Sequence, residues 1–337
     1  MGFFADARSP WLRRTLIIVF SLSIALLVIV AAVFAFVRYS VNSKIRHVSI
    51  SIPKVTVSPE NSDSRPQVES KIPPVNFLVL GSDSRVSGGN PKDWHYGAQR
   101  SDVMMIVQLS GDRKAMTIMS IPRDSWVDIP GHGKMKINAA YSLGGPQLAI
   151  DTVQSLMGIH IDHFAIVDFE SFAQMTDQLG GVTIKTVKGN QQFDGESALR
   201  FVRERKSLPN GDFDRVRRQQ AWIHALMNRV LEKKVLTDPT QVNALLDIFF
   251  SYSAVDDGLT FDSMLGFAAD ARGLRPANIT LMTAPVTGVG ESAGGQSIVL
   301  LNDELMAELS KAWADDNVTK FIASNPNITT LKSKPIR

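Results

Sequence analysis

Three short apolar runs constrain the fold more than any other feature of the sequence. They cover residues 75–80 (VNFLVL), 103–109 (VMMIVQL) and 115–121 (AMTIMSI). Each run has the length of a strand and is apolar almost throughout, which predicts strands that are buried on both faces of a sheet. Ser110, Gly111 and Asp112 predict a turn between the second and third runs, so we expect these two strands to form an antiparallel hairpin.

Helical segments alternate with these and further strands. Pro146 follows Gly144 and Gly145 where a helix is expected to begin, and Gly158 is expected to end that helix. Further helices are predicted at residues 169–179, 214–233, 239–252, 261–271 and 302–313, and further strands at 163–167, 182–184 and 279–282. Buried strands that alternate with helices indicate the α/β class, here a three-layer α/β/α sandwich on a mixed sheet. We expect one domain over residues 75–330 and a short tail over residues 331–337.

The N-terminal region predicts a membrane anchor. Residues 15–37 contain no charge, Gly or Pro, and at about 1.5 Å per residue a helix of this length spans a hydrocarbon core of roughly 30 Å. A cleaved signal peptide is the alternative, although its apolar core is usually shorter, and Ala31-Ala32-Val33 offers only a weak cleavage site.

The charges around this segment predict its orientation. Arg8, Arg13 and Arg14 precede it, and only Asp6 offsets them, so residues 1–14 are expected to stay in the cytoplasm. The protein is then a single-pass type II protein of the cell membrane. Residues 38–74, rich in Ser, Pro and charge, are predicted to be an extracytoplasmic linker.

Composition excludes several kinds of site. The 337-residue chain has no cysteine, which excludes disulfides, thiolate catalysis and cysteine-ligated zinc. Its six histidines show no HxH or HxxxH spacing, and His163 is expected to be a strand residue rather than a catalytic base. A net charge of +3 is too small to indicate a nucleic-acid partner by itself.

The most highly charged segment covers residues 195–220 (GESALRFVRERKSLPNGDFDRVRRQQ). If the chain is extended at Arg203 and Arg205, these side chains point the same way, whereas Arg215, Arg218 and Gln219 have the spacing of one helix ridge. Asp212 or Asp214 is a candidate for the helix N-cap. A helix start favours a bound anion, but a solvent-exposed basic helix face would have the same composition, and this segment alone leaves both interpretations open.

Further charged residues stand at the ends of the predicted strands. They are Asp83, Arg85, Arg100, Asp102, Arg123 and Asp124. Ligands of open α/β sheets bind at the carboxyl ends of strands, and Arg100 and Asp102, which precede their strand, reach that edge only if the strand is antiparallel. Arginine suits bidentate contacts to phosphate. Asp83 and Asp102 suit one Mg²⁺ or Mn²⁺ ion, or else ion pairs with the neighbouring Arg85 and Arg100.

These motifs together resemble the LytR-CpsA-Psr family. The matching stretches, in order and spacing, are residues 76–85 (NFLVLGSDSR), 100–104 (RSDVM), 120–124 (SIPRD), 136–141 (KINAAY), 180–182 (GGV) and 195–220. The resemblance implies an α/β/α sandwich with a groove for a polyprenyl chain. It also implies transfer of a glycan phosphate from a polyprenyl-pyrophosphate carrier, at the membrane lipid, onto peptidoglycan, with no nucleic-acid partner.

The resemblance also implies roles for individual residues. Asp83 and Asp102 would hold Mg²⁺. The resemblance assigns no general base, for which Asp124 or one of these two carboxylates is a candidate. The residues implied to bind the pyrophosphate head group are Arg85, Arg100, Arg123, Arg203, Arg205, Arg215 and Gln219. Among these, the implied catalytic residues are Arg100, Arg123, Arg203 and Arg205. Either Arg217 or Arg218 could simply face solvent. Lys136 could face a polar ligand, although a loop cap is its expected role.

Three alternatives are open at this point. Water in place of the sugar hydroxyl would make the protein a pyrophosphatase of the same lipid. A non-enzymatic regulator would use residues 214–233 as a basic DNA-binding helix, although the predicted anchor and Arg13 and Arg14 argue against it. A lipid-binding protein without activity is the third. Teichoic acid, capsular polysaccharide and arabinogalactan present the same phosphate chemistry, so the sequence leaves the glycan open.

Overall fold

A computed structural model describes residues 38–39, 42–43, 45–48, 72–82, 103–205, 207–232, 235–333 and 335–337. The chain divides into two compact units, Met1–Lys44 and Ile45–Arg337, and the fold described below is that of the second. Among the described residues, no helix is both long enough and apolar enough to cross a membrane. The predicted span at residues 15–37 lies outside them, as do Asp83, Arg85, Arg100 and Asp102.

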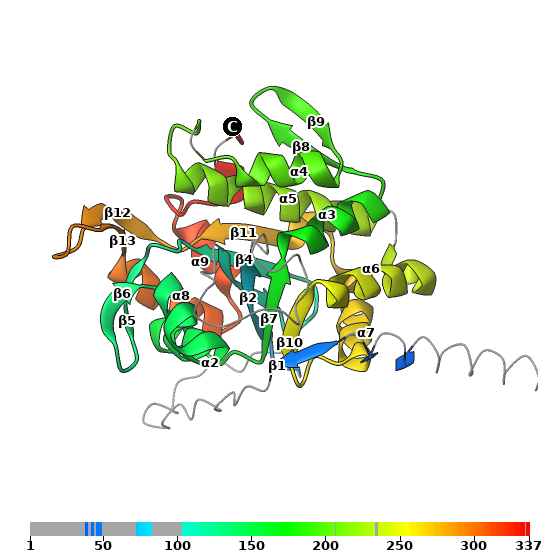
Figure 1. The fold of residues 1–337 in the computed structure, drawn as a ribbon, viewed down its shortest axis with the longest axis horizontal. Helices are drawn as coiled ribbons and strands as arrows, with labels where there is room; N and C mark the ends of the chain where they lie inside the picture. The colour runs from blue at the N-terminus through cyan, green and yellow to red at the C-terminus, as the bar shows by residue number, and fades with distance from the viewer. Residues whose placement is uncertain are drawn as a thin grey trace, which may run out of the picture. The chain divides into compact units, whose positions relative to one another are not determined.

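A mixed sheet forms the centre of the domain (Figure 1). In spatial order, its seven strands within the described residues are β1 (Arg46–Val48), β10 (Ser253–Asp256), β7 (His163–Asp168), β2 (Val75–Ser82), β3 (Val103–Leu109), β4 (Met116–Ile121) and β11 (Ile279–Thr283). Strand β3 is antiparallel to β2 and β4, whereas β7 is parallel to β2 and β11 is parallel to β4. The three predicted apolar runs are therefore adjacent strands, and the predicted hairpin is confirmed.

Alternate residues of the strands cover opposite faces of this sheet, as the two-residue period of a strand requires. Leu78, Leu80 and Ile106 belong to the core beneath one face. Phe77 and Val79, their neighbours in β2, line a cavity on the other face. Both faces are thus covered by apolar layers, which confirms the predicted three-layer α/β/α arrangement.

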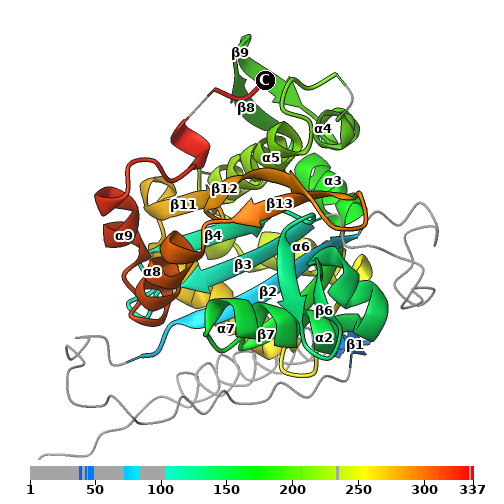
Figure 2. The ribbon, with the colours of Figure 1, turned by 90° about the vertical axis from the view of Figure 1, so that its left-hand side faces the viewer.

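Two groups of helices form the outer layers (Figures 1 and 2). On the Leu78 face lie α2 (Asn138–Met157), α8 (Asp303–Ala314) and α9 (Val318–Ser324). On the Phe77 face lie α3 (Phe169–Gln178), α5 (Asp212–Glu232), α6 (Pro239–Ser251) and α7 (Phe261–Asp270), while α4 (Gly195–Arg203) shares a core with α3 and α5. Helix α2 leaves helical geometry at Gly144 and Gly145, resumes at Pro146 and ends at Gly158, as predicted.

Three hairpins and several short helices complete the domain. The hairpins are β5 (Trp126–Ile129) with β6 (Gly133–Lys136), β8 (Val182–Thr186) with β9 (Gly189–Phe193), and β12 (Val286–Glu291) with β13 (Ser297–Leu301). The short helices are η4 (Val235–Thr237), η5 (Ala271–Gly273), η6 (Pro276–Asn278) and η7 (Leu331–Ser333). Sequence patterns predicted β8 alone among the hairpin strands, because exposed two-stranded hairpins bury too little to show an apolar run.

Segments from beyond the predicted domain take part in the fold. Arg46–Val48, within the predicted linker, pairs with β10 as an edge strand. Ile336, within the predicted tail, is buried, and its carbonyl accepts a hydrogen bond of 2.7 Å from the Val187 N–H. The described parts of the linker and the tail are therefore partly integrated in the domain.

Candidate functional site

The register of the sheet brings several predicted site segments to one edge. Gly81 near the end of β2 pairs with Val103 at the start of β3, and Met104 pairs with Ile121 at the end of β4. A Cβ atom on Gly81 would lie 2.7 Å from the Val103 Cβ, so only glycine permits this close approach. This edge, where β2 and β4 end and β3 begins, is called the site edge below.

Asp212 gathers three arginines beside the site edge. Its carboxylate lies 2.6 Å from Arg215 Nη2, 3.7 Å from Arg123 Nε and 3.9 Å from Arg205 Nε. Arg123 follows β4, Arg205 follows α4, and Asp212 and Arg215 stand in the first turn of α5. The convergence of Arg123, Arg205 and Arg215, predicted from the strand ends and residues 195–220, is therefore present in the structure.

A second ion pair adjoins this cluster. The Asp124 carboxylate lies 3.1 Å from Lys136 Nζ and 3.8 Å from Arg123 Nε. Backbone bonds fix the segment, because the Arg123 carbonyl accepts from Asn138 N–H and the Asp124 carbonyl accepts from Val299 N–H. Lys136 ends β6 and presents its charge to the site, rather than acting as a loop cap.

The predicted extended segment at Arg203 and Arg205 is wrong in part. Arg203 is the last residue of α4, and Arg205 follows it in a loop. An N-terminal capping box between Asp194 and Ser197 stabilises α4, and charged residues obscure its apolar face in the sequence. The Cα atoms of the two arginines are nevertheless within about 7 Å of each other, because only one residue separates them in the chain.

Helix α5 begins differently from the prediction. It starts at Asp212, so neither Asp212 nor Asp214 is the N-cap. Asp214, in the first turn, instead accepts hydrogen bonds from Asn210 N–H at 3.0 Å and Asn210 Nδ2 at 3.1 Å. The Asp214 carboxylate thereby closes the preceding turn and leaves the Asp212 carboxylate to the arginines.

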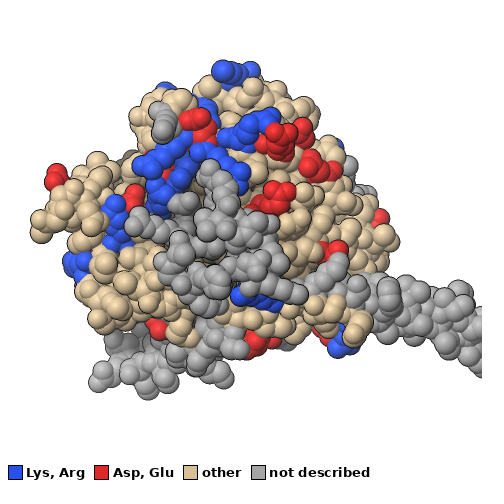
Figure 3. Space-filling model, viewed as in Figure 1, with Lys and Arg blue, Asp and Glu red and all other residues tan. Residues whose placement is uncertain are grey.

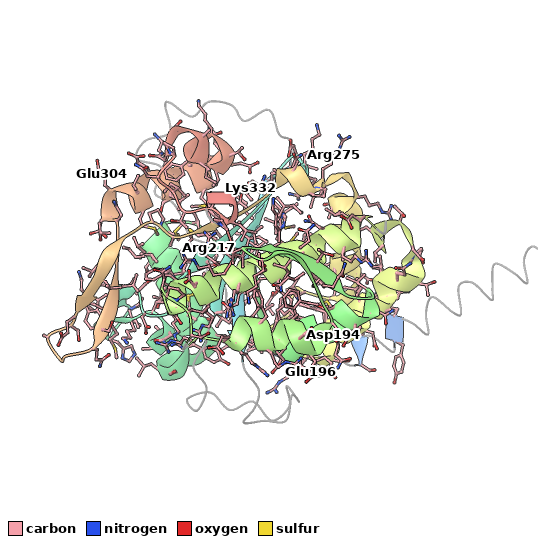
Figure 4. The ribbon with its side chains drawn as sticks, turned by 90° about the horizontal axis from the view of Figure 1, so that it is seen from above. Asp194, Glu196, Arg217, Arg275, Glu304 and Lys332 are labelled. Carbon is pink, nitrogen blue, oxygen red and sulfur yellow. The ribbon has the colours of Figure 1, made fainter. Side chains whose placement is uncertain are left out.

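The prediction that Arg217 and Arg218 face solvent is also wrong. Arg217 is buried and donates to the carbonyls of Thr330 and Leu331. In Figure 4, it lies beside the C-terminal segment that carries Lys332. Arg218 donates to the Arg337 carbonyl at 2.6 Å and to the Phe201 carbonyl at 2.9 Å, and its guanidinium lies 4.2 Å from the Phe201 ring centroid. Both side chains hold backbone segments together. Of the predicted ridge of Arg215, Arg218 and Gln219, only Arg215 and Gln219 are therefore left as candidate site residues.

Gln219 connects the arginine cluster to an apolar cavity. It is buried one helical turn after Arg215 and lines a cavity of about 410 Å³ between the sheet and the helices on the Phe77 face. Nearly all the other lining side chains are apolar. Those from the strands include Phe77, Val79, Val103, Met105, Val107, Ala165 and Val167, and those from the helices include Phe172, Trp222, Ile223, Leu246, Phe249, Met264 and Phe267.

The electrostatics of the cluster favour an anion. The cluster brings Arg123, Arg205, Arg215 and Lys136 together around the carboxylates of Asp124 and Asp212. Basic side chains also gather on the upper part of the surface in Figure 3, where α4 and α5 lie in Figure 1. Excess positive charge at reduced dielectric is costly without a counter-ion, and planar guanidinium groups suit phosphate oxygens.

The predicted metal ligands lie outside the described residues. Asp83 comes directly after Ser82 in the sequence, and Asp102 comes directly before Val103. Two carboxylates suit a hard divalent cation. Within the part of the chain that the structure describes, no group of three or more His, Asp or Glu side chains is arranged to hold a metal.

Two site residues were not identified as such from the sequence. Asp212 was assigned to helix capping, although its spacing of three residues from Arg215 is that of a helical ion pair. Lys136 was given a capping role because its distance from Asp124 depends on the β5–β6 hairpin, which the sequence did not predict. Both contacts depend on packing between separate elements.

The sequence matches the LytR_cpsA_psr family over residues 39–315. The chain belongs to this family. Among its relatives is the cell wall biosynthesis protein LcpA of Corynebacterium glutamicum, which is 30% identical over 277 residues, covering 67% of this chain and 53% of LcpA. The polyisoprenyl-teichoic acid–peptidoglycan teichoic acid transferase TagU of Oceanobacillus iheyensis is 33% identical over 271 residues, covering 73% of this chain and 79% of TagU. The regulatory protein MsrR of Staphylococcus aureus is 35% identical over 209 residues, covering 57% of this chain and 60% of MsrR.

The chain thus spans about half to three fifths of the length of LcpA and MsrR. Solved structures share the fold. TagT bound to LI-WTA superposes with a TM-score of 0.60 at 24% identity, over 80% of this chain and 99% of TagT. Protein gbs0355 of Streptococcus agalactiae gives a TM-score of 0.61 at 21% identity, over 73% of this chain and 88% of that protein. At these identities the likeness concerns the mixed α/β fold alone.

Proposed function

We propose that this protein is a membrane-anchored extracytoplasmic phosphotransferase. It moves a glycan phosphate from a polyprenyl-pyrophosphate carrier onto peptidoglycan, and residues 15–37 anchor it in the cell membrane as a single-pass type II protein. The names of LcpA and TagU, which refer to cell wall biosynthesis and teichoic acid transfer, support this proposal.

One observation carries the proposal. The apolar cavity and the arginine cluster meet at α5, where Arg215 faces Asp212 and Gln219, one turn later, lines the cavity. A ligand that fits both parts has a long hydrocarbon tail and a strongly anionic head. Polyprenyl pyrophosphate has this composition, because its tail suits the apolar walls and its head suits Arg123, Arg205 and Arg215.

The transfer itself needs charge neutralisation and in-line positioning more than covalent help from the protein. The acceptor hydroxyl oxygen attacks the phosphorus on the glycan side of the pyrophosphate. The bond from that phosphorus to the bridging oxygen breaks, and polyprenyl phosphate leaves with that oxygen. The hydroxyl proton passes to a base, for which Asp124, held beside Arg123 and Lys136, is our candidate among the described residues.

Each side chain has a part in this step. Arg123, Arg205 and Arg215 bind the pyrophosphate oxygens. They either give up their ion pairs with the Asp212 carboxylate or keep them and bind both anions. Arg203 is assigned to the same group. Arg85 and Arg100 are proposed to complete it from the site edge. Asp83 and Asp102 would hold Mg²⁺, which when bound supplies further positive charge to the phosphate oxygens.

The test uses the full chain reconstituted in lipid vesicles. It is incubated with a polyprenyl-pyrophosphate-linked glycan, peptidoglycan and Mg²⁺, and the glycan phosphate covalently attached to peptidoglycan is measured. We expect Arg215→Ala to lower the rate by about 100-fold to 1000-fold, the range for loss of one donor that stabilises transition-state charge.

Arg275→Ala is the matched control. Arg275 is an exposed arginine shortly before β11. The first residue of β11 pairs with the first residue of β4, so Arg275 is near the end of the strands that is opposite to the site edge. This variant should keep the wild-type rate. No attached product in the wild type, or equal rates for wild type and Arg215→Ala, would overturn the proposal. Glycan phosphate released equally with and without peptidoglycan would identify a pyrophosphatase instead.

A further inference from the structure

The β5–β6 hairpin, which follows the Arg123–Asp124 segment, is fixed to the domain by one of its faces. Val127 and Ile129 of β5 are buried in the core that α2 and α8 share, and Met135 of β6 packs against the same core. Successive side chains of a strand point to opposite faces. The residues that alternate with these three in the sequence therefore face away from this core, on what is called the outer face below.

The outer face of the hairpin carries a large aromatic ring beside charged side chains. Trp126 pairs with Lys136, and Asp128 pairs with Lys134. Directly paired residues of antiparallel strands have their side chains on the same face, so these four residues share the outer face. Trp126 is partly exposed, and Asp128 and Lys134 are exposed. The indole ring is therefore partly accessible from solvent, next to groups that form hydrogen bonds.

A second apolar side chain adjoins this ring. Ser125 forms a parallel bridge with Val299 of β13, and the Asp124 carbonyl accepts a hydrogen bond of 2.8 Å from the Val299 N–H. Since Ser125 and Val299 are both buried, the residues that follow them, Trp126 and Leu300, are neighbours on the outer face. Leu300 is 40% exposed. Trp126 and Leu300 together are called the apolar platform.

The apolar platform adjoins the candidate general base. Lys136, which shares the outer face with Trp126, places its Nζ 3.1 Å from the Asp124 carboxylate, and Arg123 Nε lies 3.8 Å from that carboxylate. Asp124 thus connects the arginine cluster with the apolar platform. An acceptor hydroxyl that attacks a phosphate bound at Arg123 and gives its proton to Asp124 would carry its sugar ring towards Trp126.

We infer that the apolar platform binds a sugar ring of the acceptor glycan strand, with Trp126 as the stacking side chain and Lys136 at its polar edge. The inference rests on the proposed function, since it takes the acceptor to be the glycan of peptidoglycan. One face of a pyranose ring presents C–H groups, which suit the flat face of an indole. The hydroxyl groups around the ring suit charged and hydrogen-bonding side chains beside it.

The first experiment measures glycan transfer by the full chain in lipid vesicles, with the concentrations of peptidoglycan and of the polyprenyl-pyrophosphate-linked glycan varied separately. In Trp126→Ala we expect the KM for peptidoglycan to rise by about 3-fold to 10-fold, the range for loss of one aromatic contact. The KM for the lipid-linked glycan should stay at the wild-type value. Trp126→Phe keeps a flat ring and should recover most of the affinity for peptidoglycan.

Two further variants keep this result interpretable. Val187→Ala shortens an exposed apolar side chain between β8 and β9, in another two-stranded hairpin, and it should change neither KM. Trp126→Leu replaces Trp126→Ala if the latter does not fold, since leucine keeps an apolar side chain without a flat ring. A rise in the KM for the lipid-linked glycan alone, or an equal rise in both KM values, would overturn the assignment to the acceptor strand.

The second experiment separates this inference from the proposed function. A peptidoglycan tetrasaccharide without lipid or phosphate is the probe, and saturation-transfer NMR detects which of its ring protons lie close to the full chain. The wild type should transfer saturation to these protons, and Trp126→Ala should lose the effect. A wild type that attaches glycan to peptidoglycan but shows no saturation transfer overturns this inference alone. A wild type that attaches no glycan overturns the proposed function, whatever the tetrasaccharide does.

Discussion

At the scale of single residues, the Asp212 carboxylate organises the candidate site. Arg123, Arg205 and Arg215 come from three different elements, and each places a guanidinium nitrogen within 4 Å of this one side chain. Asp212 is therefore a counter-ion that these three arginines share. A pyrophosphate head group would compete with it or share the same donors.

Asp212→Asn should therefore destabilise the protein and make it respond more strongly to added anion. We expect a loss of about 1–3 kcal/mol in the free energy of unfolding, because the ion pairs of these guanidinium groups with Asp212 are lost and like charges stay close. Inorganic pyrophosphate should raise the melting temperature of the variant more than that of the wild type. Asp303→Asn is the control, since Asp303 also begins a helix, α8, and is exposed. An equal pyrophosphate response in wild type and Asp212→Asn would contradict the counter-ion role.

Asp256 predicts a pH dependence of stability. Burial by itself would raise the pKa of its carboxyl group, but hydrogen bonds from the His163 ring and from the N–H groups of Phe164 and Gly258 hold that pKa below its usual value. A carboxyl group with a lowered pKa stabilises the fold above the unfolded-state pKa, about 3.9, and this stabilisation is lost as the pH falls through the native pKa.

Asp256→Asn should thus lower the free energy of unfolding by about 1.5–3 kcal/mol at neutral pH. The difference from the wild type should shrink on acidification, which urea unfolding at a series of pH values measures. Asp257→Asn, at the exposed neighbouring carboxylate, should show neither effect. A difference for Asp256→Asn that is independent of pH would refute this account of the carboxylate.

At the scale of elements, α5 connects most parts of the site. Its first turn holds Asp212 and Arg215, and Gln219 in the next turn lines the cavity. Gln220 donates to the Ser120 hydroxyl in β4 and to the Met282 carbonyl in β11. Arg217 and Arg218 bind the C-terminal segment. One helix thereby fixes the distance between the clustered arginines and the apolar wall.

Arg218→Ala should loosen this arrangement at the C-terminal segment. The variant loses bonds to the Arg337 and Phe201 carbonyls and the contact with the Phe201 ring, for an expected cost of about 1–3 kcal/mol. Hydrogen exchange at the Val187 N–H, which bonds to the Ile336 carbonyl, should accelerate. Arg200→Ala removes an arginine of α4 whose ion pair with Glu196 is exposed, and it should change stability by less than about 0.5 kcal/mol. Unchanged hydrogen exchange at Val187 in Arg218→Ala would show that Arg218 does not hold the C-terminal segment in place.

At the scale of the whole domain, the two faces of the sheet have different tasks. One face is filled by the side chains of α2, α8 and α9. The other face packs partly against α5, and over another part an apolar cavity, which Gln219 lines, lies between the sheet and its helices. The domain is thus suited to bind a molecule that is apolar at one end and anionic at the other.

Ligands that fill both parts should stabilise the protein more than ligands that fill only one. Dodecyl phosphate should raise the melting temperature more than dodecanol at equal saturation of the solution, and a ligand at 100 times its Kd contributes about 2.7 kcal/mol. The difference between the two ligands should vanish in Arg215→Ala and decrease at high salt. It should persist in Arg275→Ala. Equal stabilisation of the wild type by both ligands would show that one ligand does not bind the cavity and the arginine cluster together.

Much of this fold follows from local patterns in the chain. The apolar runs of β2, β3 and β4 depend on burial, which a short segment shows by itself. The second part of α2 begins after Gly144-Gly145 at Pro146 and ends at Gly158, and these signals depend on local backbone geometry. The antiparallel hairpin through Ser110, Gly111 and Asp112 likewise determined that the ends of β2 and β4 and the start of β3 share one edge. The family motifs then indicated which charged residues at that edge matter.

The elements that local patterns missed are those whose stability comes from distant partners. Helix α4 carries so many charged residues that its apolar side is hidden, and Arg203 was therefore assigned to an extended segment. Arg217 and Arg218 have the composition of an exposed basic face, yet they bind backbone carbonyls from the C-terminal segment and from α4. A charged side chain gives no local sign of whether it meets water or a remote carbonyl.

The sequence by itself determined the α/β class and the antiparallel hairpin of β3 and β4, because these depend on periodicity and on a short turn. The tertiary structure alone decided that Asp212 is the shared counter-ion of three arginines and that Gln219 opens onto the cavity. It also decided that the rings of Phe77, His163 and Phe267, from two strands and a helix, pack together. These contacts join residues from separate elements, and only packing sets the distances between them.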